Sequence, residues 1–168
     1  MKLILIPLMG LISLRAFNLT SIINPSIDHK NLNGFLNNMA EFESGNDYLA
    51  KNKFGMLGKY QFSFKTIQNL HIKTTPVKFL HDPALQDKVM IKYLKNNSLD
   101  LKPVIRKFSG KYYHNIYITK SGILAAAHFA GSSNVINFFK HYNHIKDANG
   151  ASIVLYMKKF SGYNLKGI

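Results

Sequence analysis

The sequence predicts a single compact domain that is mostly α-helical and carries a small loop or hairpin element. The chain has 168 residues, of which 46% are hydrophobic and 18% charged, a composition typical of a globular protein with a sizeable core. Several segments space their apolar residues at helical intervals, and most of these segments follow Ser or Asp and end near Gly. No internal repeat or shift in composition indicates a second folded domain.

The first 17 residues resemble a secretory signal peptide. Lys2 precedes twelve mostly apolar residues, a run shorter than the roughly 20 residues that a membrane-spanning helix needs. A buried N-terminal helix or an interfacial anchor is the alternative interpretation. We expect export, a linker over residues 18–30, which contain Pro25, and one folded domain over residues 31–168. No later stretch is apolar enough to predict a transmembrane span.

Residues 31–48 predict an amphipathic helix that ends near Ser44 and Gly45. The only two glutamates of the chain lie in this segment. At about 100° per residue, Glu41 lies opposite the apolar face and Glu43 lies within it. Burial disfavours the ionised form of a carboxyl, so Glu43 is a candidate proton donor; alternatively, it bends toward solvent or pairs with a lysine. The apolar face consists of Leu32, Phe35, Leu36, Met39 and Phe42.

The rest of the chain predicts six or seven helices in total, with little sheet. Two glycines within residues 52–62 indicate a tight loop or small hairpin, and residues 112–118 alternate loosely enough for a short strand. Asp82 and Pro83 are a strong helix start, and the polar residues 96–98 predict a break in that helix. Further helices are expected over residues 64–70 capped by Ser63, 122–131 capped by Ser121, 135–140 capped by Ser132 or Ser133, and 153–160 capped by Ser152.

The charge balance favours a polyanionic partner. Lys and Arg number 22 against eight acidic residues, which gives a formal charge of +14. Nucleic acid, an acidic membrane surface and an anionic cell-wall polymer all fit this charge, and so does a merely solubilising surface. Only Arg15 and Arg106 are arginines, and base-edge recognition favours Arg, so we expect no specific nucleic-acid partner.

Several chemistries are excluded or disfavoured by what the sequence lacks. The chain has no cysteine, which excludes disulfides, thiolate metal sites and thiol nucleophiles. It has no phosphate-binding loop, no dinucleotide fingerprint, no H-E-x-x-H and no G-x-S-x-G motif. His141 and His144 lie three residues apart, but no nearby carboxylate completes a zinc site. We therefore expect no metal or cofactor. The remaining core-facing carboxyl, glycine-rich loops and aromatic residues suit carbohydrate cleavage, which needs a general acid.

Three short blocks, in order, resemble the bacterial lytic transglycosylases of the lysozyme-like superfamily. Glu43-Ser44-Gly45 resembles their E-S motif, and residues 55–62 (GMLGKYQF) resemble their G-x-x-G-L-M-Q block. Residues 127–131 (AHFAG) resemble their A-Y-N-A-G block. The resemblance spans about residues 32–135. Lys59-Tyr60 stands in place of the usual Leu-Met and His128-Phe129 in place of Tyr-Asn, which is typical of a divergent branch.

The resemblance implies an α+β lysozyme-like catalytic domain over residues 31–168, with a loop or hairpin lining a substrate cleft. It implies that Glu43 acts first as general acid and then as base on the MurNAc–GlcNAc bond of peptidoglycan, giving 1,6-anhydro ends. It further implies an exported enzyme in the periplasm, cell envelope or medium, which we expect to be monomeric. Other anionic envelope polymers are further candidate partners. The implied substrate-binding residues are Ser44, Gly58, Tyr60, Gln61 and His128.

Three questions stay open at the level of the sequence. A charged His128 would stabilise the carboxylate form of Glu43, whereas a neutral one would leave Glu43 able to donate a proton. A hydrolytic muramidase is the near alternative, because hydrolysis generally uses a second carboxylate. A non-catalytic cationic protein that binds the wall or disrupts membranes is the alternative from another class. The candidate second carboxylates are Asp47, Asp82, Asp87, Asp100 and Asp147.

Overall fold

The computed structural model describes residues 30–142 and 150–168, which form a compact and mostly helical unit with eight helices and one two-stranded sheet. The predicted signal peptide, nearly all of the predicted linker and Asp147 lie outside the described residues. None of the helices in the described part of the chain is long and apolar enough to cross a membrane. The elements are α1 (Leu32–Ser44), α2 (Phe64–Asn69), α3 (Pro76–Leu80), α4 (Pro83–Asp100), α5 (Lys102–Phe108), β1 (Tyr112–Tyr113), β2 (Ile116–Tyr117), α6 (Lys120–Ala130), α7 (Ser132–His141) and α8 (Ile153–Lys159).

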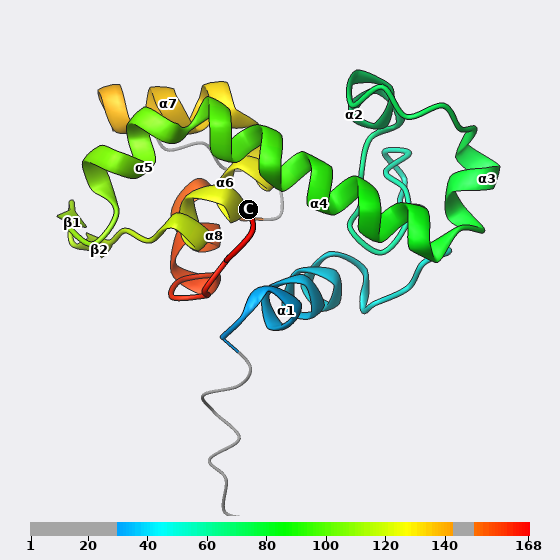
Figure 1. The fold of residues 1–168 in the computed structure, drawn as a ribbon, viewed down its shortest axis with the longest axis horizontal. Coiled ribbons are helices and arrows are strands. Elements are labelled where there is room, and N and C mark those ends of the chain that lie inside the picture. The colour runs from blue at the N-terminus through cyan, green and yellow to red at the C-terminus, as the bar shows by residue number, and fades with distance from the viewer. Residues whose placement is uncertain (1–29, 143–149) are drawn as a thin grey trace, which may run out of the picture.

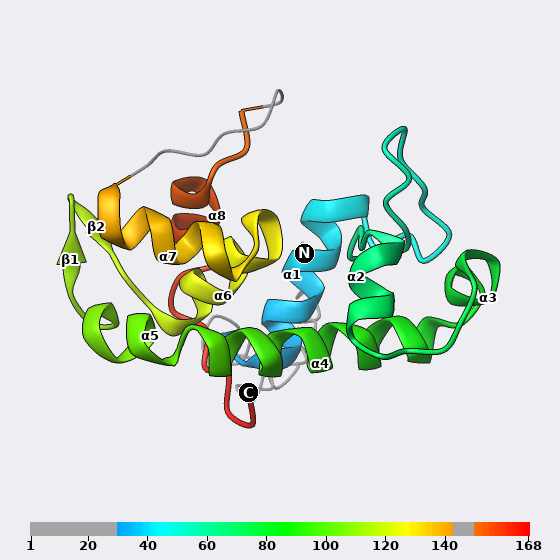
Figure 2. The same cartoon turned by 90° about the horizontal axis from the view of Figure 1, so that it is seen from above.

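The long helix α4 connects the two ends of the molecule. Figure 1 shows α2 and α3 at one end of α4, and α5, the β1–β2 hairpin and α7 at the other. Helix α6 packs against α4, α7 and α8, and its residues Ala125, Ala126 and Ala127 are completely buried. Seen from above, α1 lies between the α6–α8 group and the α2–α3 end (Figure 2). The last turn of α1 therefore lies between the two ends of the molecule.

Helix α1 matches its prediction except at Phe42. Asn31 caps the helix by accepting a hydrogen bond from the Gly34 amide, and Gly45 ends it in the left-handed conformation with a φ of 67°. Phe35 and Met39 are completely buried, as the apolar spacing predicts. Phe42 is 38% exposed, so its predicted place in the core is wrong. At this last turn the Phe42 ring meets Tyr156 and Phe160 edge to face, and the Lys159 ammonium lies over it, 4.6 Å from the ring centroid.

Helix α4 begins as predicted but does not break at residues 96–98. The Asp82 side chain accepts a hydrogen bond from the Leu85 amide, and Pro83 occupies the first turn. Asn97 is buried and its Nδ2 donates to the carbonyl of Tyr93, one turn earlier in the same helix. The polar run is thus accommodated within the helix, which continues to Asp100.

Of the four helix caps predicted to be serines, two are confirmed and two are wrong. Ser63 caps α2 and Ser152 caps α8, each through its side-chain oxygen. Thr119, rather than Ser121, caps α6, which begins one residue before Ser121; that serine is completely buried and accepts from the Tyr163 amide. Helix α7 begins directly after Gly131 with no side-chain cap, so neither Ser132 nor Ser133 has the predicted role. The helix missed from the sequence is the short α3, capped by Thr75.

Both predicted extended elements are present. β1 and β2 pair antiparallel around His114 and Asn115, which have φ values of 46° and 61° and make the tight turn that joins short strands. In residues 51–62, Leu57 exchanges both backbone hydrogen bonds with Phe62, at 2.9 Å each. This second element forms a compact loop that projects beside the C-terminal end of α1.

Candidate active site

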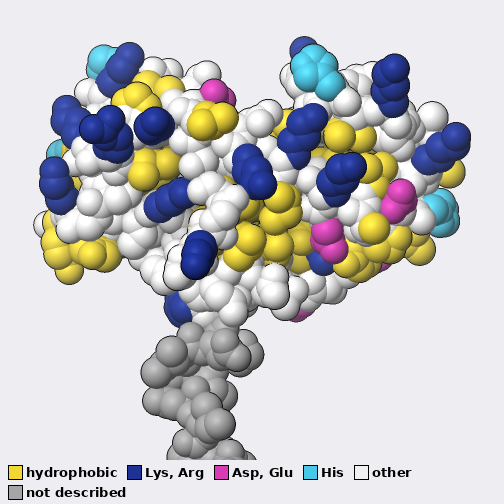
Figure 3. Space-filling model, in the orientation of Figure 1, with side chains coloured by type: hydrophobic (Ala, Val, Ile, Leu, Met, Phe, Trp, Pro, Cys, Tyr) yellow, Lys and Arg dark blue, Asp and Glu magenta, His cyan; other side chains and the backbone are white. Residues whose placement is uncertain are grey.

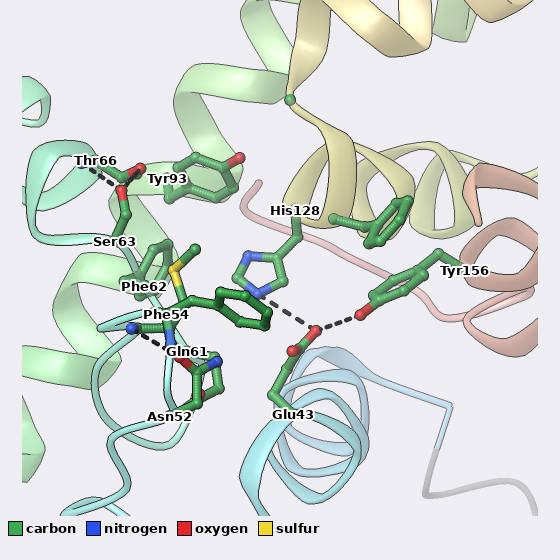
Figure 4. A pocket seen from close by; sticks show the side chains of 13 residues that line it. Glu43, Asn52, Phe54, Gln61, Phe62, Ser63, Thr66, Tyr93, His128 and Tyr156 are labelled. Atoms are coloured by element: carbon green, nitrogen blue, oxygen red, sulfur yellow. Dashed lines mark hydrogen bonds and ion pairs between the residues drawn. The ribbon is translucent and has the colours of Figure 1, made fainter. Parts of the chain in front are cut away.

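A pocket of about 560 Å³ opens at the C-terminal end of α1. The loop of residues 52–63 lines one side of it, and residues of α6 and α8 line the other. Figure 4 shows the Glu43 carboxyl between these two sides, facing His128 and Tyr156. The pocket therefore collects residues from four separate parts of the sequence around one carboxyl group.

Glu43 is held by a tyrosine from the far end of the chain. Its side chain is only 15% exposed, and its Oε1 accepts a hydrogen bond from the Tyr156 hydroxyl at 2.7 Å. The His128 Nε2 lies 3.7 Å from the same oxygen, which is too far for a hydrogen bond. Among the described residues, Oε2 of Glu43 has no hydrogen-bond partner. One carboxyl oxygen is thus anchored by the protein, and the other is available to a ligand.

His128 fits its surroundings as a neutral imidazole. Its Nε2 lies 2.9 Å from the Tyr60 carbonyl oxygen, and because a carbonyl only accepts, the ring proton belongs on Nε2. The Nδ1 atom is buried and has no partner in the part of the chain that the structure describes. A second proton there would be a buried donor without an acceptor, which is costly. Of the two alternatives left open by the sequence, the neutral His128 fits this geometry.

Aromatic rings hold His128 and Tyr156 in place. The His128 ring meets Phe62 edge to face with 5.2 Å between centroids, and meets Tyr93 at 5.7 Å. Burial raises the pKa of Tyr93, which therefore stays protonated and donates to the Ala127 carbonyl at 2.8 Å. On the other side, Tyr156 stacks on Phe129 with 4.9 Å between ring centroids. Both groups that face Glu43 are therefore fixed by packing as well as by hydrogen bonds.

The structure brings together three of the six predicted site residues. Glu43, Gln61 and His128 all line the pocket. Gln61 has a φ of 50°, and its Nε2 donates to the Gly58 carbonyl at 2.8 Å, so this side chain also stabilises the turn that carries it. Phe129 lines the pocket as well.

The other three predicted residues, Ser44, Gly58 and Tyr60, lie behind the pocket and outside its lining. The Ser44 hydroxyl donates to the Lys59 carbonyl at 2.9 Å and thereby ties the end of α1 to the loop. Gly58 has a φ of 72°, and a side-chain carbon there would overlap the Gln86 side chain. Tyr60 is 1% exposed, and only its backbone carbonyl reaches His128. These residues shape the pocket through the position of the loop.

A buried polar network, which the sequence did not reveal, anchors the same loop to α4. The Lys59 ammonium lies 3.0 Å from Asp87 and donates to the Tyr48 hydroxyl at 2.8 Å. The Tyr60 hydroxyl donates to Asp87 at 2.9 Å, and Gln86 Oε1 accepts from the Lys59 amide at 2.9 Å. Lysine in a loop, and glutamine and aspartate on a helix, usually occupy solvated positions, so only their contacts reveal this role.

The charges in this network shift two pKa values upward. Burial opposes the charged form of Lys59, but the hydrogen bonds to Tyr48 and Asp87 and the charge of Asp87 outweigh it, so the pKa of Lys59 is raised. Burial raises the pKa of Tyr60 far above its usual range, and the negative charge of Asp87 adds to the effect. Lys59 is therefore a cation and Tyr60 a neutral phenol at neutral pH.

Tyr156 is the site residue that the sequence did not single out. It is separated from Glu43 by 113 residues. The sequence offers only a weak indication of its role, which is its position in the helix that Ser152 caps, next to the buried Met157. Helical spacing predicts that such a residue faces inward, but it does not identify the carboxyl that its hydroxyl contacts.

None of the other described carboxylates lines the pocket. Asp47 accepts from the Leu49 amide in an exposed turn, Asp82 caps α4, and Asp87 belongs to the Lys59 network. Asp100 lines a different groove beside α5. Within the described ranges, no group of three or more His, Cys, Asp or Glu side chains is placed to hold a metal ion.

The arrangement offers one carboxyl, anchored at one oxygen, in a pocket with aromatic and amide walls. Such a carboxyl can donate a proton to a ligand and later take one back, because its protein contacts do not neutralise its charge with a fixed cation. Comparisons of the chain with protein-family models, with curated proteins and with solved structures found no match.

Proposed function

We propose that the protein is an exported, lysozyme-like enzyme that cleaves peptidoglycan as a lytic transglycosylase, with Glu43 as its catalytic residue. The observation that carries the proposal is the Glu43 carboxyl in the pocket. Tyr156 holds one of its oxygens, and no second carboxylate of the described residues lines the same pocket. A reaction in which one carboxyl serves twice suits this arrangement better than one that needs two carboxylates.

The chemistry balances with Glu43 alone. Protonated Glu43 gives its proton to the glycosidic oxygen between MurNAc and GlcNAc, and the bond from that oxygen to the MurNAc C1 breaks. The Glu43 carboxylate then takes the proton from the MurNAc C6 hydroxyl, whose oxygen bonds to C1 and closes the 1,6-anhydro ring. The substrate's own acetamide can stabilise the positive charge at C1 between these steps. Glu43 ends in its starting state, and no water is consumed.

The residues around Glu43 support both of its roles. The Tyr156 hydrogen bond orients the carboxyl, and a charge-assisted hydrogen bond of this kind is strongest when Glu43 is ionised. Neutral His128 places no fixed positive charge beside the Glu43 carboxyl. Both residues are positioning residues in this proposal, since neither needs to touch the sugar.

The pocket walls fit a glycan strand. Phe54, 69% exposed, and Phe129 offer aromatic faces to the apolar side of a sugar ring. Asn52, Gln61 and Ser63 also line the pocket and present amide and hydroxyl groups to sugar hydroxyls. The excess of lysine across the protein suits an anionic cell-wall polymer.

A hydrolytic muramidase is the near alternative. It generally needs a second carboxylate at a set separation from the first, and the four aspartates at positions 47, 82, 87 and 100 do not line the pocket. Asp147 belongs to residues 143–149, which are outside the described ranges. Product analysis separates the two enzymes, because a hydrolase leaves free reducing ends whereas a transglycosylase leaves 1,6-anhydro ends.

The test uses the two glutamates of the chain as a matched pair. Purified peptidoglycan is incubated with wild type, Glu43→Gln and Glu41→Gln, and the released muropeptides are identified by mass spectrometry. Wild type and Glu41→Gln should release 1,6-anhydro products at similar rates, because the exposed Glu41 side chain accepts from the side-chain amide of Asn46 and does not line the pocket. Glu43→Gln should release them at least about 100-fold more slowly with an unchanged melting temperature.

Two other outcomes contradict the proposal. Free reducing ends in the wild-type digest would make the protein a hydrolase. Undiminished muropeptide release by Glu43→Gln would show that Glu43 is not the catalytic residue. If the effect of the protein on bacterial walls also disappeared with added salt, a non-catalytic cationic protein would be the better description.

A further inference from the structure

A second groove of about 560 Å³ lies along the junction of α4 and α5, outside the candidate active site. Four basic residues surround it, and the side chains between them are aliphatic. Figure 3 shows Lys and Arg side chains distributed over α5 and the adjoining end of α4, with apolar side chains between them. The basic residues are Lys95, Lys102, Arg106 and Lys120, and the aliphatic ones are Leu99, Ile105 and Ile168; we call this surface the basic groove.

Three of the four cations of the basic groove, Lys95, Lys102 and Arg106, have no carboxylate partner among the described residues, whereas Lys120 donates to the Ile168 backbone oxygen at 2.5 Å. No ion pair joins any of them to an acidic residue within the described residues. Residues 95–107 contain four basic side chains and one acidic one, Asp100, which lines a separate groove. Lys107 extends the positive charge along α5 into an adjoining hollow. The surface therefore carries a clear excess of positive charge.

Leu99 gives the basic groove an apolar centre. Its side chain is 71% exposed although it belongs to the long helix α4, whose other leucines at 85 and 94 are partly or completely covered. An exposed leucine surrounded by lysine ammonium groups is the arrangement of a surface that inserts an apolar side chain among anionic head groups. The charges alone would keep this surface soluble, and an exposed leucine adds nothing to solubility.

The basic groove and the candidate active site face opposite sides of α4. Tyr93 of α4 lines the active-site pocket, and at about 100° per residue Lys95 and Leu99 lie roughly 200° and 240° from it around the helix. Figure 2 agrees, since α4 runs along one side of the molecule and the loop of residues 51–62 projects from the other. Binding through the basic groove would leave the pocket open.

We propose that the basic groove binds an anionic lipid surface, with Leu99 entering the head-group layer and the lysines contacting lipid phosphates. Nucleic acid fits less well, because the groove has one arginine and no aromatic side chain on which a base could stack. Bound in this way, the protein presents its active-site pocket away from the bilayer. The inference does not rest on the proposed function, because it uses no residue of the pocket.

The test compares two double variants of equal charge in the full chain. Lys102→Gln with Arg106→Gln removes two charges from the basic groove, and Lys73→Gln with Lys78→Gln removes two exposed charges at the far, α3 end. Binding to phosphatidylcholine vesicles containing phosphatidylglycerol is measured by co-sedimentation. At about fivefold per basic residue, the groove variant should bind about 25-fold more weakly, and the α3 variant should stay within about threefold of wild type. Vesicle binding by any other part of the chain is the same in both double variants, so it cancels when their affinities are compared.

A second pair of measurements separates a lipid surface from a soluble polyanion. Leu99→Ser should weaken vesicle binding about tenfold, because a leucine side chain no longer leaves water, and should leave binding to inorganic polyphosphate unchanged. Equal weakening by both double variants would reduce the effect to net charge and overturn the proposal. Equal binding to vesicles of pure phosphatidylcholine, or Leu99→Ser vesicle binding equal to wild type, would also overturn it. Glu43→Gln should bind vesicles like wild type, whatever its effect on peptidoglycan.

Discussion

The two sides of the pocket are held in different ways. On the loop side, Gly58 lies against the side chain of buried Gln86, and the Lys59–Asp87 ion pair ties the loop to α4. On the helical side, Gly122 of α6 lies against α8, where an added side-chain carbon would sit 2.6 Å from the Met157 carbonyl oxygen. One side depends on polar contacts to a helix, and the other on close packing between two helices.

This difference follows from what each segment can bury. Helix α6 carries small residues at Gly122 and at positions 125–127, where its backbone packs closely against its neighbours. The loop buries Leu57, Tyr60 and Phe62, but it also has many backbone groups outside regular secondary structure that need hydrogen bonds. Its position is therefore defined by Gln86, Lys59 and Asp87, whose contacts are directional. Removing a polar partner should therefore lower stability most on the loop side. On the helical side, a change in side-chain volume should lower it most.

The strongest test of the loop side is Gly58→Ala. The new methyl group must adopt a φ of 72° and also overlap the Gln86 side chain, so we expect a loss of about 3 kcal/mol in the free energy of unfolding. Gly110→Ala is the matched control, because its φ is 80° but no atom lies within 4 Å of the added carbon. That control should lose only about 1 kcal/mol in urea denaturation. Equal losses would mean that the contact with Gln86 is unimportant.

The next largest effect is expected from Asp87→Asn. This change leaves the nearly buried Lys59 ammonium without its carboxylate, and because Asp87 itself is 45% exposed, we expect about 2 kcal/mol rather than the full cost of a buried pair. Adding Lys59→Met to the variant should recover part of the loss. Asp100→Asn, at an exposed end of α4, should change stability by less than about 0.5 kcal/mol. If the two aspartate variants are equally stable, the ion pair does not anchor the loop.

On the helical side, Tyr156→Phe probes function without disturbing packing. The ring keeps its stacking on Phe129 and loses the hydroxyl that donates to Glu43, so the rate of the proposed muropeptide release should fall about tenfold. Tyr163→Phe is the control, since the Tyr163 hydroxyl accepts from Asn38 away from the pocket. Its rate should match wild type, and both melting temperatures should stay within about 2 °C of wild type. A fully active Tyr156→Phe would show that Glu43 needs no such orientation.

The smallest effect is an alkaline loss of stability that belongs to the loop side. The pKa values of Lys59 and Tyr60 are raised in the folded protein above their usual 10.5 and 10.0. Above about pH 10 the unfolded chain loses these protons while the folded chain keeps them, so stability falls as the pH rises. The free energy of unfolding, measured by urea denaturation, should fall less steeply from pH 9 to 11 in Asp87→Asn than in wild type. The variant lacks the negative charge that helps raise the pKa values of Lys59 and Tyr60. Identical slopes would contradict the assignment.

Most of the helices could be predicted from the sequence, because their determinants are local. Asn31, Asp82 and Ser152 each cap a helix by accepting from a backbone amide three residues away. Two local predictions are wrong. Ser121 does not cap α6 because it is completely buried within the helix, and residues 96–98 do not break α4 because Asn97 bonds within that helix. Whether a polar residue ends a helix or is accommodated in it depends on what packs around it.

The sequence by itself determined which of the two glutamates points inward, because helical phase separates Glu41 from Glu43 whatever surrounds them. Only the tertiary structure decided what Glu43 meets. Its hydrogen bond comes from Tyr156 in α8, and the proton of neutral His128 faces a carbonyl of the loop. The physical reason is distance along the chain. Helical phase and helix caps depend on residues a few positions apart in the sequence. The contacts of Glu43 and His128 form only when the loop and the helices have packed around the end of α1.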